Sequence, residues 1–400
     1  MGQALRELDP RSSAAAAFGA ELRDRRLRSG QSLAALGRSV LVSGDLLGKI
    51  EKAQRRPHPD LVRQLDDALG ARGELVRLAA AFIEIRADPQ MPKLDEFTPD
   101  VAGERLRSLI GQVRNADHAM AADRLHEVVG YAEAAEKIAP KVSVRRRAVL
   151  WRAVAEAHQL AGWMMFDRGQ RRSAEKLLTR ARTAAERARA LDVMAYVGGP
   201  NTAFMSTWSG EPALGAEQAY GALAWAYRSG NRRLTAFVAT MAARAHARMG
   251  EADLCRRMLS TAEAELASHR AEDPDPDWLT VFDAAALAGH RGSCLLDLGN
   301  PRLAVAALQE QERAGPTGFV RNNIIWQLER AVADLHLGKI DEAAAGIGRT
   351  LDQVGQGPIT PRVLRVFRSV DLQLGTTVRA TAPTIGDTKV RLHEFIAAYG

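Results

Sequence analysis

Residues 42–57 read VSGDLLGKIEKAQRRP, a short helical stretch that ends in a basic turn and a proline. Ser43 is a good N-cap, so we expect a helix to begin there. Val42, Leu47 and Ile50 form an apolar stripe that predicts one buried side. The other side carries two glycines and an aspartate, which lower helix propensity. A helix kept only for packing would rarely choose them, so we expect this exposed side to press against another molecule.

Short helical patterns surround this stretch and are joined by very short links. Gly30 and Gly70 end two of them, and Pro59 suits the first turn of another. The predicted helices cover residues 18–29, 32–39, 43–52, 59–69 and 74–86. We therefore predict a compact five-helix domain over residues 18–86, preceded by a flexible N-terminus over residues 1–17.

The helix that starts at Ser43 is expected to point five residues outward, namely Gly44, Asp45, Leu46, Gly48 and Lys49. Small residues permit close approach to a DNA major groove, and the longer side chains reach the edges of the bases. The lysine suits a phosphate or a guanine, the leucine a thymine methyl group, and the aspartate a cytosine amino group. This pattern favours a DNA-recognition helix.

The stretch LRDRRLRSGQSLAALGRSVLVSGDLLGKIEKAQRRPHPDLVRQLDDALG, residues 22–70, resembles the lambda-repressor-like (XRE-type) helix-turn-helix family, in its actinobacterial form. The resemblance covers roughly residues 18–72. The residues that carry it are Leu22-Arg23, Gly30 with Ser32, Val42-Ser43, Ile50-Glu51-Lys52, Arg55-Arg56-Pro57 and Leu65 with Ala68-Leu69-Gly70. It implies a homodimer that binds a roughly two-fold double-stranded DNA operator.

Two positions depart from the family pattern. Leu33 stands where many members carry a glutamine, and Gly44 stands where a basic residue is usual. We therefore expect affinity for DNA to depend largely on the surrounding basic residues. The predicted DNA-binding residues are Arg23, Arg26, Arg38, Ser43, Gly44, Asp45, Leu46, Lys49, Lys52, Arg55 and Arg56.

The overall composition is that of a globular protein, 46% hydrophobic and 26% charged, with a net charge of +7. Charge of this size supports a polyanionic partner only weakly, but residues 18–63 hold ten Lys or Arg against five Asp or Glu. No apolar run is long enough for a membrane span, and no signal core precedes the first helix. Cys255 and Cys294 make no disulfide framework. We expect a cytoplasmic protein with buried free thiols and no membrane partner.

Residues 87–100, ADPQMPKLDEFTPD, contain three prolines and read as a linker. Beyond them the chain is rich in alanine and repeats itself. Each repeat has a glycine, a few spacer residues and then a helix rich in Ala and Leu. The glycines are Gly169, Gly210, Gly250, Gly299 and Gly338, at spacings of 41, 40, 49 and 39. A fixed period of this kind indicates a stacked array of helical hairpins.

Each unit is expected to be a helix, a tight turn closed by a left-handed glycine, and a second helix. The segment LGKIDEAAAGI, residues 337–347, most resembles a tetratricopeptide repeat, although the period exceeds the usual one. The fold class that follows is all-α, with a tetratricopeptide-like solenoid over residues 101–400. Residues 101–138 are a degenerate first pair, and residues 361–400 supply a last helix, a loop and a capping helix.

A solenoid offers a concave groove that is usually lined by the first helix of each pair. Aromatic residues fall there, although most aromatics in such arrays are core. Polar residues in first helices say more, because a packing face does not need them; asparagine amides bind peptide backbones and arginines bind carboxylates. The predicted ligand-binding residues are Asn201, Arg244, Asn323, Trp208 and Trp326.

No arrangement of residues points to an enzyme, a cofactor or a metal. HExxH, GxSxG and GxxxxGK[ST] are absent, and His118 with His126, eight residues apart, is a poor metal site. The leading hypothesis is a transcription regulator whose solenoid dimerises and senses a small molecule or a peptide. The alternative is a solenoid scaffold or anti-activator that retains a vestigial helix-turn-helix.

Overall fold

The computed structural model describes residues 14–399 with several gaps, and every regular element in those residues is helical. The fold is therefore all-α, as predicted. The chain divides into two compact units, residues 1–85 with 395–400, and residues 86–394. Within the described residues, no helix combines the length and the apolar character needed to cross a membrane. The gaps are residues 41, 56, 58, 72, 81–98, 119, 121–123, 271, 315–318, 356–358 and 378–382.

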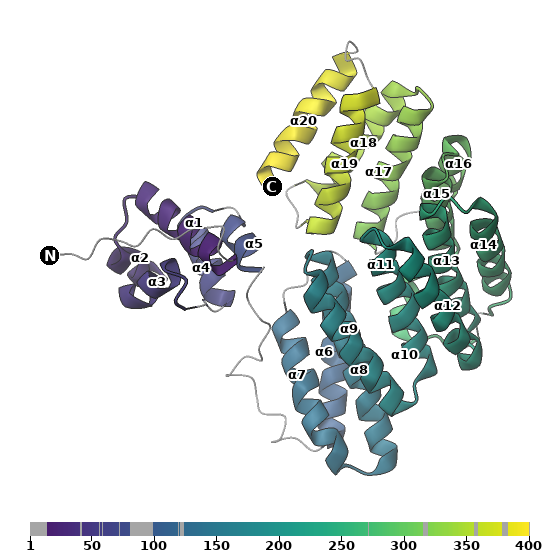
Figure 1. Ribbon diagram of the computed structural model, residues 1–400, viewed down its shortest axis with the longest axis horizontal. Coiled ribbons are helices and arrows are strands. Elements are labelled where there is room, and N and C mark those ends of the chain that lie inside the picture. The colour runs from purple at the N-terminus through teal and green to yellow at the C-terminus, as the bar shows by residue number, and fades with distance from the viewer. Residues whose placement is uncertain are drawn as a thin grey trace. The chain divides into compact units, whose positions relative to one another are not determined.

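The first unit contains a bundle of five helices, drawn in purple and blue in Figure 1. They are α1 (Ala14–Arg28), α2 (Leu33–Ser39), α3 (Gly44–Glu51), α4 (Pro59–Ala68) and α5 (Glu74–Ala80). The first helix begins before the predicted start at Phe18, because a run of alanines extends it. The predicted continuation of the last helix to Arg86 lies outside the described residues, as does most of the predicted linker over 87–100.

All five helices contribute to one apolar core. Leu47 of α3 is fully buried, and Ile50, one turn further along, is 1% exposed, so the stripe predicted from the sequence faces inward. Burying a side chain of this size stabilises the fold by about 2 kcal/mol. The buried core residues are Phe18, Leu22, Leu36, Val40, Leu47, Ile50, Leu61, Val62, Leu65, Ala71, Leu75 and Ala79.

Side-chain caps set where the short helices begin. Ser32 Oγ accepts a hydrogen bond from the Ala35 amide at 3.1 Å and caps α2. Ser43 Oγ accepts from the Leu46 amide at 3.2 Å and caps α3, as its N-cap position predicted. Each cap satisfies an amide that lacks a partner within its own helix, and a cap of this type contributes about 1 kcal/mol.

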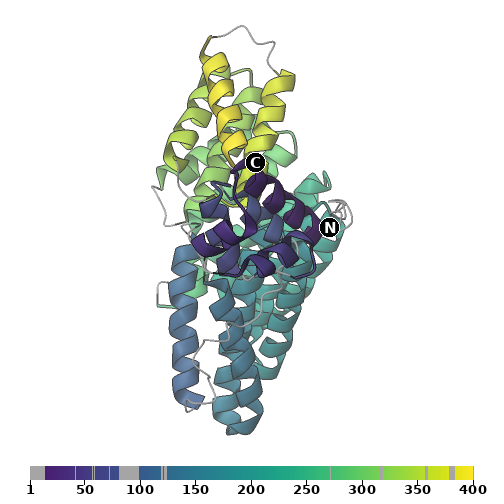
Figure 2. The same ribbon diagram turned by 90° about the vertical axis from the view of Figure 1, so that its left-hand side faces the viewer.

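The second unit is an array of antiparallel helices, seen from two sides in Figures 1 and 2. The helices are α6 (Pro99–His118), α7 (Leu125–Ile138), η2 (Ala139–Lys141), α8 (Val144–Asp167), α9 (Arg171–Ala188), α10 (Leu191–Tyr196), η3 (Val197–Ala203), α11 (Phe204–Trp208), α12 (Pro212–Ser229), α13 (Arg232–Arg248), α14 (Ala252–Ala267), η4 (Asp277–Val281), α15 (Ala284–Asp297), α16 (Pro301–Arg313), α17 (Val320–His336), α18 (Ile340–Val354), α19 (Pro361–Thr377) and, as far as residue 394, α20 (Pro383–Tyr399).

The repeat glycines lie where the sequence placed them, at the turn inside each hairpin. All five have positive φ, and the values are +76° at Gly169, +90° at Gly210, +74° at Gly250, +72° at Gly299 and +72° at Gly338. At the first of these turns the glycine amide donates to Phe166 O and the next amide donates to Met165 O, which satisfies the last carbonyls of α8. The prediction of left-handed glycine turns is confirmed.

Candidate DNA-binding face and candidate ligand cavity

The two glycines of α3 face α2 and not the outside. A Cβ atom on Gly44 would lie 3.1 Å from the Ala34 nitrogen, and a Cβ atom on Gly48 would lie 3.4 Å from Leu33 Cδ1. Leu46 is also half-buried and packs against the core. The expectation that these three residues of α3 point outward is therefore corrected: the glycines let two short helices approach each other closely.

Three polar residues remain exposed on the first two turns of α3, namely Ser43 at its N-cap, Asp45 and Lys49. Lys49 Nζ lies 2.7 Å from Asp45 Oδ2, and the two side chains are 50% and 75% exposed. An exposed pair of this kind contributes at most about 1 kcal/mol, so a phosphate group can compete for the lysine.

Further basic side chains lie close to α2 and α3 in the sequence. Arg38, Lys52 and Arg55 are exposed and Arg23 is half-buried, whereas Arg56 lies outside the described residues. Exposed guanidinium and ammonium groups near a recognition helix are suited to the phosphates that flank a major groove.

Arg26 has a different position from the other predicted DNA-binding residues. It is 8% exposed, and its Nε and Nη2 atoms donate to the Glu51 carboxylate at 2.5 and 2.9 Å, while Nη1 donates to Gln31 O at 2.9 Å. The hydrogen bonds to Glu51 raise the pKa of the guanidinium. This buried pair joins α1 to the end of α3, so the geometry gives Arg26 the task of orienting the helix.

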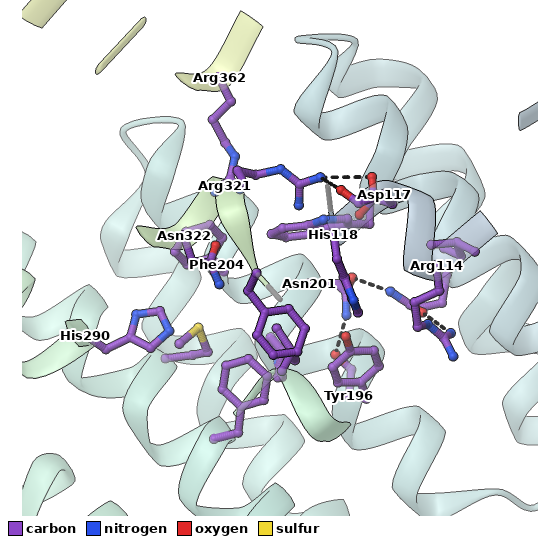
Figure 3. A pocket seen from close by; sticks show the side chains of 18 residues that line it. Arg114, Asp117, His118, Tyr196, Asn201, Phe204, His290, Arg321, Asn322 and Arg362 are labelled. Carbon is purple, nitrogen blue, oxygen red and sulfur yellow. Dashed lines mark hydrogen bonds and ion pairs between the residues drawn. The ribbon is translucent and has the colours of Figure 1, made fainter. Parts of the chain in front are cut away.

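The second unit contains a cavity of about 70 Å³ where the first helices of its hairpins converge (Figure 3). It is lined by residues of α6, α8, α10, η3, α11, α13, η4, α15, α17 and α19. A smaller cavity of about 20 Å³ shares four of its residues, Phe204, His290, Asn322 and Arg362. Polar and aromatic residues of first helices thus meet at one place, even though they are spread over most of the array.

The predicted ligand-binding residues fall around these two cavities with one exception. Asn201 lines the larger cavity, and Trp208, Arg244 and Trp326 line the smaller one. Asn323 lines neither: it is buried, and its Oδ1 accepts a hydrogen bond from Gln311 Nε2 at 3.2 Å. Its neighbour in the sequence, Asn322, lines both cavities in its place.

Asn201 also stabilises an irregular helical segment. Pro200 lies within the π-helical segment η3 and has no amide hydrogen to donate to a preceding carbonyl. Asn201 Nδ2 donates to Tyr196 O at 2.9 Å, and its Oδ1 accepts from Gln159 Nε2 at 2.8 Å (Figure 3). Both ends of the amide are therefore already bonded within the protein, and these bonds help to hold η3 in shape.

Four buried charges connect the beginning of the array to its end. Arg321 of α17 reaches Asp117 Oδ1 of α6 at 2.9 Å and Asp167 Oδ2 of α8 at 2.6 Å. Arg362 of α19 reaches Asp167 Oδ1 at 2.6 Å. Arg321 lies 204 positions after Asp117 in the sequence, and Arg362 lies 195 positions after Asp167. We call these four side chains the buried charge network.

None of the four residues of this network was predicted from the sequence. One signal was present, because Asp167 directly follows the apolar run WMMF in a helix that is otherwise buried at that end. A charge placed in an apolar run needs a partner, since burying it alone is costly. The identity of that partner is not readable from the sequence.

Aromatic rings surround the guanidinium of Arg362. Its Cζ lies 5.0 Å from the ring centroid of Trp163, 5.6 Å from Phe166, 5.7 Å from Phe204 and 5.4 Å from Trp208. Rings at this distance attract a cation and exclude water from it. Burial also lowers the pKa of Arg362, and the charge of the neighbouring Arg321 acts in the same direction.

Two histidines in the cavity wall are held neutral. Burial lowers the pKa of His118 to about 4, and the positive charges of Arg321 and Arg114 act in the same direction. Burial lowers the pKa of His290 to about 3, with Arg244 and Arg362 adding to the effect. Near neutral pH these rings are therefore uncharged hydrogen-bonding groups.

Metal-binding clusters of three or more His, Cys, Asp or Glu residues are absent from the described part of the chain. Cys255 and Cys294 are buried free thiols, as predicted. The described side chains around the cavities offer the chemistry of binding, with paired charges, aromatic rings and amides.

Comparison with known proteins matches residues 17–79 to a helix-turn-helix domain family. No curated protein sequence matches the chain. Among solved structures, the chain is similar to Bacillus thuringiensis PlcR in complex with the peptide PapR7 and DNA, with 12% identity and a TM-score of 0.29 over 74% of this chain and 96% of that one. Residues 17–79 are therefore a helix-turn-helix domain, which in this chain precedes an array of helical hairpins.

Proposed function

We propose that the protein is a sequence-specific DNA-binding transcription regulator whose helical-repeat unit binds a small effector and dimerises. The observation that carries the proposal is a helix-turn-helix whose α3 is capped, oriented by the Arg26–Glu51 pair and flanked by exposed basic residues. The combination of a helix-turn-helix domain with a cavity elsewhere in the chain is suited to regulation by a ligand.

In the proposed complex, α3 enters the major groove. Lys49 and Asp45 lie nearest the bases, while Arg38, Lys52 and Arg55 bind phosphates on either side of the groove. Ser43, Gly44 and Leu46 contribute mainly by fixing the helix end and its approach to α2. Arg23 extends the basic surface.

The experiment selects bound fragments of genomic DNA with the full-length protein at two salt concentrations. A regulator recovers a few discrete, roughly two-fold sites at both concentrations, whereas binding to all fragments that collapses with salt argues against sequence-specific recognition. Lys52→Ala with Arg55→Ala should weaken binding to every selected site and lower the salt slope by about one for each phosphate that is no longer neutralised. The charge-matched control is Arg172→Ala with Lys176→Ala, two exposed residues of α9.

Dimerisation is tested separately by sedimentation of the same protein with and without a selected operator. We expect the mass of two chains in both cases, because a two-fold operator requires two copies of α3. A single chain bound to one half-site would remove dimerisation from the proposal and leave DNA binding in place.

One observation favours a second candidate function, an interaction protein with a vestigial helix-turn-helix. The first exposed residue of α3 is Asp45, whose carboxylate repels phosphate and pairs with Lys49 in the absence of DNA. Under this alternative, the Lys52 and Arg55 substitutions leave the cellular phenotype unchanged. A lost phenotype that tracks weakened DNA binding would exclude it.

A further inference from the structure

The guanidinium of Arg362 is buried and only partly satisfied. The residue is 5% exposed; its Nε pairs with Asp167, whereas its Nη2 has no hydrogen-bond partner in the described structure. A buried donor without a partner costs about 1–3 kcal/mol, and more when it is charged. Such a group calls for a partner, and Arg362 lines both cavities.

A second unpartnered nitrogen lies in the same wall. His290 Nδ1 is buried and has no hydrogen-bond partner among the described residues, and this residue also lines both cavities. The amide side chain of Asn322 lines them as well, and Figure 3 shows it between Arg321 and His290. An unsatisfied guanidinium, an uncharged imidazole and an amide together offer donors to an anion with two or three acceptor positions.

The charged groups that line the larger cavity restrict the charge of its ligand. Three arginines line the larger cavity, namely Arg114, Arg321 and Arg362. The buried charge network pairs Asp117 and Asp167 with Arg321 and Arg362, and the Glu156 carboxylate interacts with Arg114, so the distinctive group of the wall is the Arg362 Nη2 atom, which has no hydrogen-bond partner in the described residues. Both histidines of the wall are neutral near pH 7. One carboxylate would supply the acceptor that this guanidinium lacks, whereas a divalent anion would bring a second buried charge for which the described part of the wall has no further unpartnered guanidinium beside it.

The volume and the lining of the larger cavity restrict the rest of the ligand. The larger cavity measures about 70 Å³, and a water molecule needs roughly 10–15 Å³ on this scale, so the occupant has on the order of five to seven non-hydrogen atoms. Trp163, Phe204, Phe237 and Met241 give the lining a large apolar part. An inorganic phosphate or sulfate would leave this apolar surface unused and would demand more donors than the wall supplies.

We propose that the cavity binds a small organic monocarboxylate, with its carboxylate on Arg362 Nη2 and its short apolar body against the aromatic lining. The inference rests on the effector-binding part of the proposed function and names the class of effector. The aromatic rings hold the guanidinium plane in place, so its free edge is preorganised for the carboxylate. Because Arg362 is also bonded to Asp167, the carboxylate would bind next to the contact that joins α19 to α8.

The first experiment uses wild-type protein without DNA. Propanoate, butanoate and pentanoate are titrated while the melting temperature and tryptophan fluorescence are recorded. Propanamide, butanamide and pentanamide are the uncharged isosteres, and butylamine is the cation. We expect at least one acid to bind saturably and to raise the melting temperature by about 2–4 °C, with its amide at least about tenfold weaker. If no acid binds, or if amides bind as well as acids, the inference is overturned.

The second experiment locates the site. Arg362→Gln should lower affinity for the best acid at least about tenfold and reduce its preference over the amide, and Arg362→Lys should restore part of both. Arg365→Gln, an exposed arginine on the same helix, is the matched control and should leave affinity unchanged. Equal affinity in Arg362→Gln and Arg365→Gln would refute the assignment. If the Arg362 variants do not fold, the wild-type comparison of acid with amide still decides the ligand class.

The two proposals fail in different ways. Acid binding without operator selection would leave the carboxylate site standing and remove the regulator. Operator selection without acid binding would leave the regulator and remove this ligand class. Where both succeed, operator affinity measured with and without the acid gives the coupling between them.

Discussion

Substituting two glycines in the helix-turn-helix by alanine should have opposite effects on stability. Gly37 in α2 and Gly48 in α3 both lie inside helices, where alanine is favoured over glycine by about 1 kcal/mol. If both glycines served only to let DNA approach, both substitutions would stabilise the free protein. The surroundings of the added methyl group predict instead that Gly48→Ala stabilises the domain and Gly37→Ala destabilises it.

The magnitude follows from where the new Cβ atom falls. At Gly48 its nearest neighbour is Leu33 Cδ1 at 3.4 Å, an ordinary contact, so we expect a gain of up to about 1 kcal/mol. At Gly37 it would lie 2.5 Å from Val42 O, and that segment is tied down because the Val42 amide donates to Gly37 O at 2.8 Å. Overpacking costs about 1–3 kcal/mol, which exceeds the gain in propensity. The two variants should differ by about 2 kcal/mol or more.

The assay has to report on the first unit within the full-length chain. Residues 1–85 contain no tryptophan and no tyrosine, so fluorescence reports only on the rest of the protein. Native-state hydrogen exchange of peptides from α1 and α4 avoids this problem and also avoids the substituted helices. A difference of about 2 kcal/mol corresponds to roughly thirtyfold in exchange rate. Equal protection in the two variants, or greater protection in Gly37→Ala, would refute the packing argument.

Three further experiments test the buried ionisable groups. Arg26→Met should destabilise the first unit by about 3 kcal/mol, and adding Glu51→Met should recover most of that stability, as measured by the same hydrogen exchange. Asp167→Asn should lower the free energy of unfolding of the second unit by about 3 kcal/mol in urea, followed by tryptophan fluorescence; the exposed control Asp253→Asn should change it by less than about 1 kcal/mol. Burial lowers the pKa of His118 to about 4 in the folded state, so the unfolded chain takes up the proton first. The free energy of unfolding therefore falls as the pH drops from about 6.5 towards 4, by at most about 1.4 kcal/mol per pH unit. Urea unfolding of His118→Gln at pH 6.5 and 4.5 should show a smaller fall than that of the wild type.

The hairpin architecture was readable from the sequence because local physics determines it. Each repeat glycine has to adopt positive φ to close its helix, and the spacing of those glycines gives the period of the array. The cap at Ser43 and the buried stripe of Leu47 and Ile50 were readable for the same reason, since each depends on residues within one or two turns.

The glycines of α3 were misread because sequence does not separate two uses of a small side chain. Gly44 has low helix propensity, and its small size allows close approach either by DNA or by a neighbouring helix. Deciding between them requires the position of Leu33 and Ala34 of the preceding helix relative to α3, and that position is set by tertiary structure. The predicted outward face of α3 was correct for Asp45 and Lys49, which are exposed.

The charge network was beyond prediction for a stronger reason. Arg321 and Arg362 meet partners about two hundred residues earlier in the chain, because the last hairpins of the array return to the first. Nothing in a repeat period of about 40 residues encodes such a return. The prediction that polar residues of first helices matter was useful for Asn201 and Arg244, whereas Asn323 missed the cavity by one position in the sequence.

The buried charge network is poorly explained by stability alone. Replacing buried ion pairs with apolar residues of similar volume is often neutral or stabilising, because desolvation offsets the attraction between the charges. Here the network also leaves Arg362 Nη2 unsatisfied beside a cavity, which adds to its cost. A ligand carboxylate would remove that cost and would bind to the same guanidinium that holds α19 to α8. The free energy gained when Arg362 Nη2 acquires a partner then contributes to the binding of the carboxylate. The Arg362–Asp167 contact between α19 and α8 becomes the element whose strength depends on the effector.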